Sequence, residues 1–178
     1  MSGIETVDTP FIKLATDAAA AVAAALTQAI ERREIALADL FDEAYAPIRG
    51  SDPQQVMAKF TQATDRLLPA IQEPLLAKSD KIVFCASVDR NGYLPTHNTK
   101  FSQPQRAGDA AWNGANCRNR RMFNDRVGLA AGRSQKPFLV QTYRRDMGGG
   151  KFALMKDVSA PITIQGRHWG GFRIGYKI

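Results

Sequence analysis

The sequence predicts an α+β fold, in which a five-stranded antiparallel sheet carries helices on one face and an N-terminal helical arm precedes it. Apolar residues recur at helical spacing through the first third of the chain, and short apolar or alternating runs dominate after residue 81. Turns rich in glycine and asparagine separate several of these runs, which favours antiparallel neighbours. Helices that come before and between such strands are typical of an α+β layer arrangement.

The first predicted element is a helix from residue 9 to about residue 33. Thr9 and Pro10 are typical of a helix start, with a capping residue followed by proline in the first turn. Alanine makes up most of the apolar stripe that follows, so a second helix can approach closely. We therefore expect the chain to form a homodimer through these N-terminal helices.

The remaining elements are predicted from shorter patterns. A turn-rich linker divides the chain into a helical arm and linker, residues 1–50, and a main domain, residues 51–178. Asn91 and Gly92 predict a tight hairpin turn, since both tolerate positive φ. The further helices are expected over residues 37–45, 53–78 and 116–132. The strands are expected over residues 82–88, 93–98, 138–145, 151–164 and 168–176.

Composition and charge narrow the function classes. The chain has 178 residues, a formal net charge of +7 and a hydrophobic fraction of 44%, which suits one folded domain. Basic residues are concentrated after residue 80, which fits either an anionic ligand or a basic surface that docks on the acidic first half. They are dispersed without interleaved aromatic residues, so we do not expect nucleic-acid binding.

The sequence also bears on the compartment. No apolar run approaches the roughly 18 residues of a membrane helix, so we expect no membrane span. The N-terminus has no basic segment followed by an apolar one, as a signal peptide would have. We therefore expect a cytoplasmic location.

Several segments of the second half carry a resemblance to a known family. They are residues 84–98, 119–129, 141–146 and 166–176, and they include Asp89-Arg-Asn-Gly-Tyr93 and Gly166-Arg-His-Trp-Gly-Gly171. These segments resemble the sensory module, of PAS or Cache type, that many bacterial methyl-accepting chemotaxis proteins carry after their signalling helices. The resemblance covers nearly the whole chain, although the chain has no room for that family's long coiled-coil signalling domain.

The resemblance implies a function in bacterial chemotaxis or signal transduction. The implied role is a sensor domain that binds a small molecule, couples its occupancy to the packing of the N-terminal helices and acts on a chemotaxis signalling partner. No catalytic residue is expected, because the chain has no Gly-x-Ser-x-Gly, dinucleotide-binding or phosphate-loop pattern. We therefore do not expect an enzyme.

A pocket for a small molecule needs a few convergent polar groups in an apolar lining. The expected ligand-binding residues are Tyr93, His97, Arg121, Tyr143, His168 and Trp169. His168 alternates with Phe172, which places it on the pocket side of its strand and Trp169 on the other, unless the glycines between them break the alternation. Other roles stay open for three of these residues. Either histidine can be a hydrogen-bonded structural group, and Arg121 can form an intrahelical ion pair with Asp125.

No cofactor or metal site is expected, because the two cysteines form no paired motif and the chain has only two histidines. In the cytoplasm Cys85 and Cys117 are expected to be thiols. The alternative function is a haem-binding or redox-sensing PAS-like domain. In that case His97 or His168 would ligate haem iron, or the cysteines would report oxidation.

Overall fold

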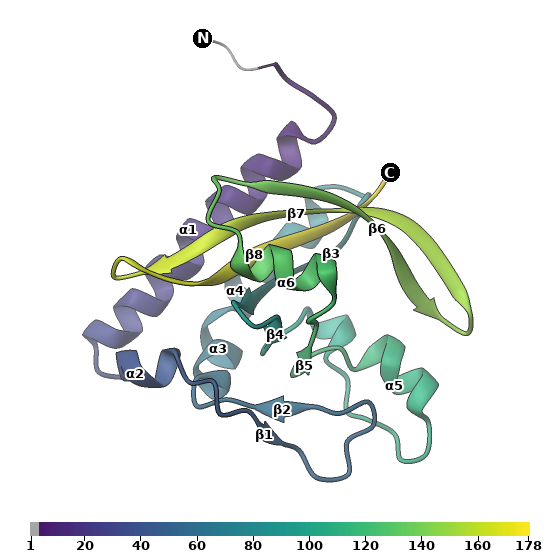
Figure 1. The fold of residues 1–178 in the computed structure, drawn as a ribbon, viewed down its shortest axis with the longest axis horizontal. Coiled ribbons are helices and arrows are strands. Elements are labelled where there is room, and N and C mark those ends of the chain that lie inside the picture. Colours follow the sequence, from purple (N-terminus) through teal and green to yellow (C-terminus); the bar gives the residue numbers. More distant parts are fainter. Residues whose placement is uncertain (1–3) are drawn as a thin grey trace.

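A four-stranded antiparallel sheet lies at the centre of the computed structural model, which describes residues 4–178 (Figure 1). Glycine-containing turns join its last three strands into a meander, as the sequence predicted, and the α+β class is confirmed. In spatial order the strands are β3 (Ile82–Asp89), β8 (Arg167–Lys177), β7 (Lys151–Ile164) and β6 (Leu139–Gly148).

The predicted fifth strand does not join this sheet. Within residues 93–98 only β4 (Tyr93–Leu94) forms a strand, and it pairs with β5 (Arg121–Met122) in a separate small sheet. The side chain of Asp89 explains the departure, because its Oδ1 accepts hydrogen bonds from the backbone N–H groups of Asn91 (2.8 Å) and Tyr93 (3.0 Å). The chain is thereby held in a turn that leads away from β3, so the sheet has four strands where five were expected.

Residues 116–132, predicted as one helix, are divided by a strand. Helix α5 (Ala110–Asn116) ends before β5, and α6 (Arg126–Arg133) begins after it. Arg120 adopts a positive φ of 62°, which interrupts any helical path. The backbone N–H groups of Arg120 and Phe123 donate to carbonyl groups next to and within β4, so pairing with β4 prevails over local helix propensity.

The segment between the first helix and the sheet is more irregular than predicted. Short elements replace the helices expected over residues 37–45 and 53–78, in a region that prolines interrupt. Two two-residue strands pair with each other, ahead of short helical turns. These elements are α2 (Leu37–Leu40), β1 (Ala46–Pro47), β2 (Val56–Met57), α3 (Thr61–Leu67), α4 (Pro69–Gln72), the 3-10 helix η1 (Glu73–Ala77) and, after β4, the 3-10 helix η2 (Thr99–Phe101).

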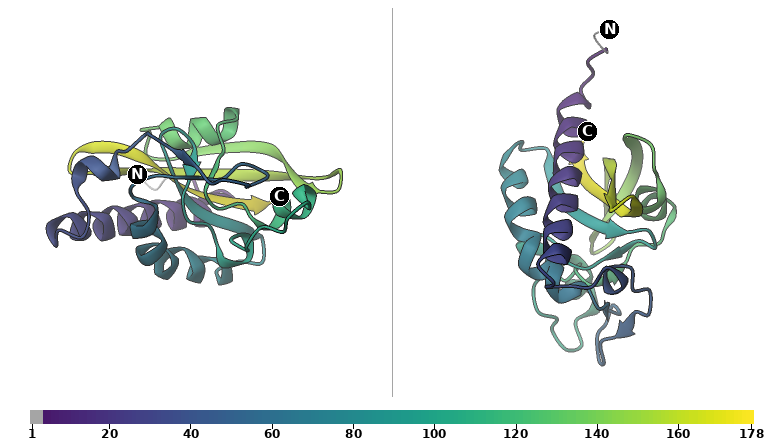
Figure 2. Two further views of the ribbon diagram at one scale, coloured as in Figure 1. Left: turned by 90° about the horizontal axis from the view of Figure 1, so that it is seen from below. Right: turned by 90° about the vertical axis from the view of Figure 1, so that its left-hand side faces the viewer.

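Helices cover both faces of the sheet, which corrects the expectation of one covered face. Figure 2 shows α1 (Thr9–Glu31) on one side of the strands and α6 on the other. Helix α6 rests on β8 where Gly171 leaves room, since a Cβ there would lie 2.3 Å from the carbonyl oxygen of Ala131. The middle of β8 is therefore buried on both faces, and alternate residues enter different environments.

The alanine-rich stripe of α1 packs against the chain's own sheet. Ala15, Ala18, Ala19, Val22 and Leu26 are buried in one core with apolar residues of β7 and β8. The small side chains let the helix lie close to the strands, so the close approach expected from the sequence occurs within the chain. A homodimer stays a prediction, and it would need a surface other than this stripe.

Helix α1 has the length and composition to cross a membrane, with a mean hydropathy of 1.3 over an 18-residue window. It is the one helix with these properties among residues 4–178. Its sequence contains no continuous apolar run of that length, because Thr16 and Asp17 interrupt the apolar residues, and the sequence therefore did not predict it as a candidate span. Its apolar face packs onto the sheet, as that of a core helix does.

Replacing Ala15 by leucine should destabilise the fold, because this side chain has no exposed surface and faces the sheet. The expected loss in the free energy of unfolding is about 1–3 kcal/mol, measured by urea denaturation. The matched control is Ala24→Leu on the exposed side of the same helix, for which a change below about 0.5 kcal/mol is expected. Equal effects at the two positions would show that α1 does not dock on the sheet in solution.

Candidate functional site

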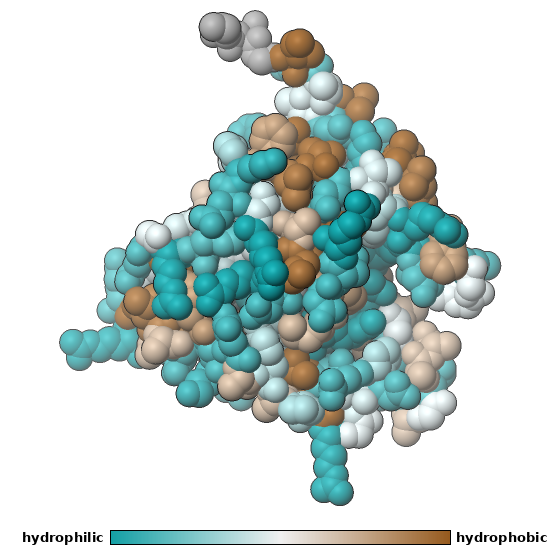
Figure 3. Space-filling view, in the orientation of Figure 1, coloured by the Kyte–Doolittle hydropathy of each residue, from teal (hydrophilic) through white to brown (hydrophobic). Residues whose placement is uncertain are grey.

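A cavity of about 170 Å³ lies between the α6-bearing face of the sheet and the chain segment that runs from β4 to α6. The molecular surface on this side is mostly hydrophilic (Figure 3). The sheet wall consists of Phe84, Tyr143, Arg145 and Arg173, and the facing wall of Leu94, His97, Arg118 and Phe123. Three exposed residues form the rim, namely Asp125, Arg144 and Asp146. The cavity is thus basic on both walls and lined with aromatic rings.

Strand alternation assembles the sheet wall. Tyr143 and Arg145 are two residues apart on β6 and point to the same face. Phe84 of β3 lies opposite Gly175 of β8, where a Cβ would come within 2.1 Å of the phenyl ring. Because Gly175 has no side chain, the ring of Phe84 can lie over β8 and form an apolar floor.

Arg173 forms a buried ion pair with Asp157, which lies next to it on the same face. Its Nε and Nη2 atoms are each 2.8 Å from Asp157 Oδ2, and the carboxylate is fully buried. Burial lowers the pKa of Arg173, but the Asp157 carboxylate, with smaller contributions from Tyr143 and Asp125, raises it above its usual value. The pair therefore brings no net charge to the cavity.

Arg145 and Arg118 have no such partner, since no ion pair within residues 4–178 involves either guanidinium. Arg145 is 5% exposed, and its guanidinium lies 4.9 Å from the ring centroid of Phe84 and 5.1 Å from that of Phe101. Arg118 donates through Nη1 to the carbonyl of Gly114 (3.1 Å), but its buried Nε has no partner in the described structure. Burial, and then the nearby Arg145, lower the pKa of Arg118 to about 9, so it stays protonated at neutral pH.

The Tyr143 hydroxyl is a further unpaired group on the sheet wall. Its oxygen is buried and forms no hydrogen bond of good geometry with any residue that the structure describes, although the Arg145 guanidinium lies near enough to interact with it. Burial, followed by the Asp157 carboxylate, raises the pKa of Tyr143, so the hydroxyl keeps its proton. An unpaired buried hydroxyl costs about 1–3 kcal/mol, which a hydrogen-bonding ligand would recover.

His97 presents a neutral imidazole with a defined tautomer. Its Nδ1 accepts a hydrogen bond from the backbone N–H of Asn98 (2.7 Å), so Nε2 carries the ring proton. Burial lowers the pKa of His97 well below its usual value, and four surrounding cations, Arg145 first among them, lower it further. The imidazole is therefore a neutral hydrogen-bond donor on the cavity wall.

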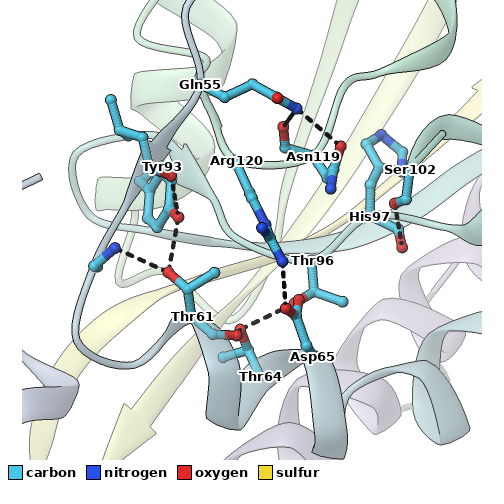
Figure 4. Close-up of polar contacts among 12 residues, drawn as sticks. Gln55, Thr61, Thr64, Asp65, Tyr93, Thr96, His97, Ser102, Asn119 and Arg120 are labelled. Carbon is cyan, nitrogen blue, oxygen red and sulfur yellow. Dashed lines mark hydrogen bonds and ion pairs between the residues drawn. The ribbon is translucent and has the colours of Figure 1, made fainter. Parts of the chain in front are cut away.

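A polar network on the far side of the facing wall fixes the segment that carries His97 (Figure 4). The hydroxyl of Thr96 donates to Asp65 Oδ1 (2.6 Å), and Gln72 Nε2 donates to the Thr96 carbonyl (3.1 Å). Arg120 adds an ion pair from Nη2 to Asp65 Oδ2 at 2.6 Å. The wall is therefore tied to α3 and α4.

Of the six predicted ligand-binding residues, the structure brings His97 and Tyr143 to the cavity. Tyr93 is fully buried elsewhere, and its side chain points toward α3 (Figure 4). Its hydroxyl donates to the carbonyl of Val56 and pairs with the hydroxyl of Thr61, both at 2.8 Å. Tyr93 therefore joins structural elements and does not line the cavity.

Arg121 lies just outside the lining. Its guanidinium is 5.0 Å from the ring centroid of Phe123, and Nη1 donates to a carbonyl of α5. The ion pair with Asp125 does not form, because the helix that would place the two residues four apart is replaced by β5. The arginine from this region that reaches the cavity is Arg118.

A β-bulge overturns the predicted faces of His168 and Trp169. Ile162 of β7 pairs with Gly170 while Thr163 pairs with His168, so Trp169 is an extra residue between two pairs. Trp169 packs into the core on the α1 side, where its Nε1 donates to the last carbonyl of α2 (2.8 Å). His168 is half-buried near the start of the strand, outside the cavity, and burial lowers its pKa.

Three basic and three apolar residues of the two walls were not predicted from the sequence, nor were the three rim residues: Arg118, Arg145, Arg173, Phe84, Leu94 and Phe123 form the walls. One signal was available, because Arg145 follows the predicted Tyr143 by two positions on a strand and must share its face. No comparable signal existed for Arg118, since its segment was expected to be a helix.

Acid should destabilise the fold through His97. Its pKa is about 6.5 in an unfolded chain and well below that in the folded chain, so the unfolded state takes up the proton first as the pH falls. The contribution of His97 to stability is therefore complete above about pH 6.5 and is lost below it, by up to about 2 kcal/mol at pH 5. Urea denaturation at pH 7 and pH 5 should show a larger loss for the wild type than for His97→Gln. Equal losses would contradict a neutral, buried His97, because all other titrating groups are common to the two proteins.

Comparisons with known proteins do not assign this cavity to a family. No family model matches the chain, and no curated protein gives a significant match. The role of the cavity has to be inferred from its own geometry.

Proposed function

We propose that this chain is a ligand-sensing domain, not an enzyme, and that its cavity binds a small organic anion. The observation that carries the proposal is Arg145, a cavity-wall guanidinium that is 5% exposed and has no carboxylate paired with it among residues 4–178. Burying an unpaired charge costs several kcal/mol, and buried charges in proteins are normally paired. An anionic ligand supplies the missing partner.

Size and lining favour a small carboxylate with an apolar body. A cavity of about 150 Å³ can hold a benzene molecule, so a cavity of about 170 Å³ admits one ring or a short aliphatic chain. Phe84, Leu94 and Phe123 supply the apolar surface. A guanidinium binds a carboxylate through two parallel hydrogen bonds, and a few convergent donors in an apolar lining are typical of small-molecule sites.

The sensor part of the proposal rests on β7, which connects the two faces of the sheet. Asp157 lies on the cavity face and pairs with Arg173. The preceding residue, Lys156, lies on the other face, where its Nζ is 3.0 Å from both carboxylate oxygens of Asp8 at the start of α1. Tyr176 of β8 donates to the same carboxylate (2.8 Å). A ligand that shifts the Arg173–Asp157 pair would therefore move the anchor of α1.

This coupling agrees with the role that the resemblance to PAS and Cache modules implies. In that role, occupancy of the cavity changes the packing of the N-terminal helix, and a chemotaxis signalling partner responds to the change. We extend the proposal to a bacterial cytoplasmic location and to a homodimer that uses the outward side of α1.

The haem alternative is disfavoured by size. The cavity that His97 lines admits one ring, whereas a porphyrin joins four pyrrole rings in a plane, and His168 lies outside this cavity. No cluster of three or more His, Cys, Asp or Glu residues in the described part of the chain could hold a metal ion.

The redox alternative is disfavoured by the environment of the thiols. Cys85 and Cys117 are both buried and free. Burial raises the pKa of both, and that of Cys85 to about 12, so the reactive thiolate is scarce at neutral pH.

Replacing Arg145 by methionine should weaken anion binding while the fold survives. Methionine keeps much of the volume and removes the charge, so binding should weaken at least about 30-fold, or about 2 kcal/mol. Without ligand, the variant should gain about 1 kcal/mol in the free energy of unfolding, because the cost of a buried unpaired charge exceeds the cation–π contacts that are lost. The probes are sodium acetate, benzoate, succinate and phosphate, titrated by calorimetry at constant ionic strength.

The matched control for that experiment is Arg126→Gln, which removes an exposed positive charge of α6 outside the cavity lining. This variant should bind like the wild type. An Arg145→Met protein that binds these anions as tightly as the wild type, or a wild type that binds none of them, would overturn the proposal.

Coupling to α1 is a separate prediction. An anion that binds the wild type should change amide hydrogen exchange in the first two turns of α1, because the Lys156 and Tyr176 contacts with Asp8 respond to a shift of β7 and β8. Exchange in the last two turns of α1, which lie at the other end of the helix from Asp8, serves as the internal control. Binding without any change of exchange in α1 would support a ligand-binding domain but contradict the proposed coupling to α1.

A further inference from the structure

We propose that the cavity selects a dianion, in particular a short dicarboxylate, over a monoanion of similar size. This inference rests on the proposed function and extends it to the class of ligand. Its basis is that one small cavity has an unpaired guanidinium on each of two walls, Arg145 on the sheet and Arg118 on the facing segment.

The groups that line the interior leave two positive charges uncompensated. Arg173 is neutralised by Asp157 at 2.8 Å. His97 is a neutral donor and Tyr143 keeps its proton, so neither changes the balance. Arg118 and Arg145 carry the remaining charge, and they are near enough that Arg145 disfavours the protonated form of Arg118. A single carboxylate would compensate one of them and leave the other.

The rim does not supply the missing negative charge. Asp125, Asp146 and Arg144 are exposed, so water and salt weaken their effect on the interior. The Asp125 carboxylate acts on the Arg173–Asp157 pair, but neither rim aspartate forms an ion pair with Arg118 or Arg145. Asp146 is also engaged locally, since its Oδ1 accepts the backbone N–H of Gly148 (2.8 Å). The rim aspartates form no ion pair with the guanidinium groups of the two walls, and Arg144 offsets part of their repulsion of an anion.

Each guanidinium is held by its own contacts. Arg145 lies near the rings of Phe84 and Phe101, at 4.9 and 5.1 Å from their centroids. Arg118 is fixed on the other wall by a 3.1 Å hydrogen bond from Nη1 to the carbonyl of Gly114, with its guanidinium 5.2 Å from the ring centroid of Phe123. Both groups are thereby held in the walls of one cavity, where a molecule with a carboxylate at each end of a short apolar chain would bind both.

Inorganic phosphate offers the same charge in a more compact form. It lacks an apolar body to cover Phe84 and Leu94, so the lining favours the dicarboxylate. His97 Nε2 and the Tyr143 hydroxyl are neutral donors that would bind the carboxylate oxygens left over by the two arginines.

The test is calorimetric titration of the wild-type chain with succinate, butyrate and inorganic phosphate at pH 7 and constant ionic strength. Succinate and butyrate have the same carbon count, so their comparison isolates the second carboxylate. Succinate should bind at least about tenfold more tightly than butyrate, as expected for one additional charged hydrogen-bonded contact. Phosphate tighter than succinate would support the dianion class and overturn the assignment to dicarboxylates.

Arg118→Met is the variant that separates the two charges. It should reduce succinate affinity to near that of butyrate and change butyrate affinity less than about threefold, while Arg126→Gln leaves both unchanged. If Arg118→Met does not fold, the wild-type comparison still decides the question. Equal affinity of succinate and butyrate in the wild type would overturn this inference and leave the proposed function standing. No binding of any of the three anions, nor of acetate or benzoate, would overturn both.

Discussion

The constraint on which the rest of the structure depends is that β7 and β8 are covered on both faces. Helix α1 lies on one face and α6 on the other (Figure 2), and the cavity lies on the α6 face. Each residue in the middle of these strands therefore enters either the apolar core beneath α1 or the face that carries α6 and the cavity, according to the parity of its position. This is why Asp157 and Lys156, neighbours in sequence, form ion pairs on opposite faces with partners as different as Arg173 and Asp8.

Basic residues elsewhere in the chain form ion pairs, which the cavity arginines Arg118 and Arg145 do not. The acidic first half and the basic second half meet in ion pairs such as Arg120 with Asp65 and Lys156 with Asp8. Much of the charge asymmetry seen in the sequence is thereby explained by contacts within the chain. Arg145 is more deeply buried than these basic partners and forms no ion pair within residues 4–178. Its internal compensation comes from the nearby Tyr143, from the Asp157 carboxylate at longer range and from its contact with the ring of Phe84. Such a contact recovers about 0.5–2 kcal/mol, less than the cost of burying the charge.

The cavity also depends on a segment that belongs to no strand of the main sheet. Asp89 turns the chain away after β3, and the short pairing of β4 with β5 then brings His97 and Arg118 over the sheet. Had residues 93–98 continued as a strand beside β3, the sheet would have lacked this facing wall. The departure from the expected five strands and the existence of the cavity therefore have the same cause.

The sequence by itself determined the elements whose causes are local. Proline in the first turn and a continuous helical stripe set α1, an apolar run set β3, and glycine-containing turns set the meander from β6 to β8. Two members of the lining, His97 and Tyr143, were also predictable as polar groups on or next to strands.

Only the tertiary structure decided which residues meet. The stripe of α1 packs on its own sheet because β7 and β8 offer it an apolar face. The bulge at Trp169 reverses the faces that simple alternation assigned, because one extra residue shifts the parity of everything before it. Arg118 and Arg145, distant in sequence, share a cavity because chain reversals after β3 and after α6 bring their segments together. Contacts of this kind depend on long-range packing, which no local pattern of residues encodes.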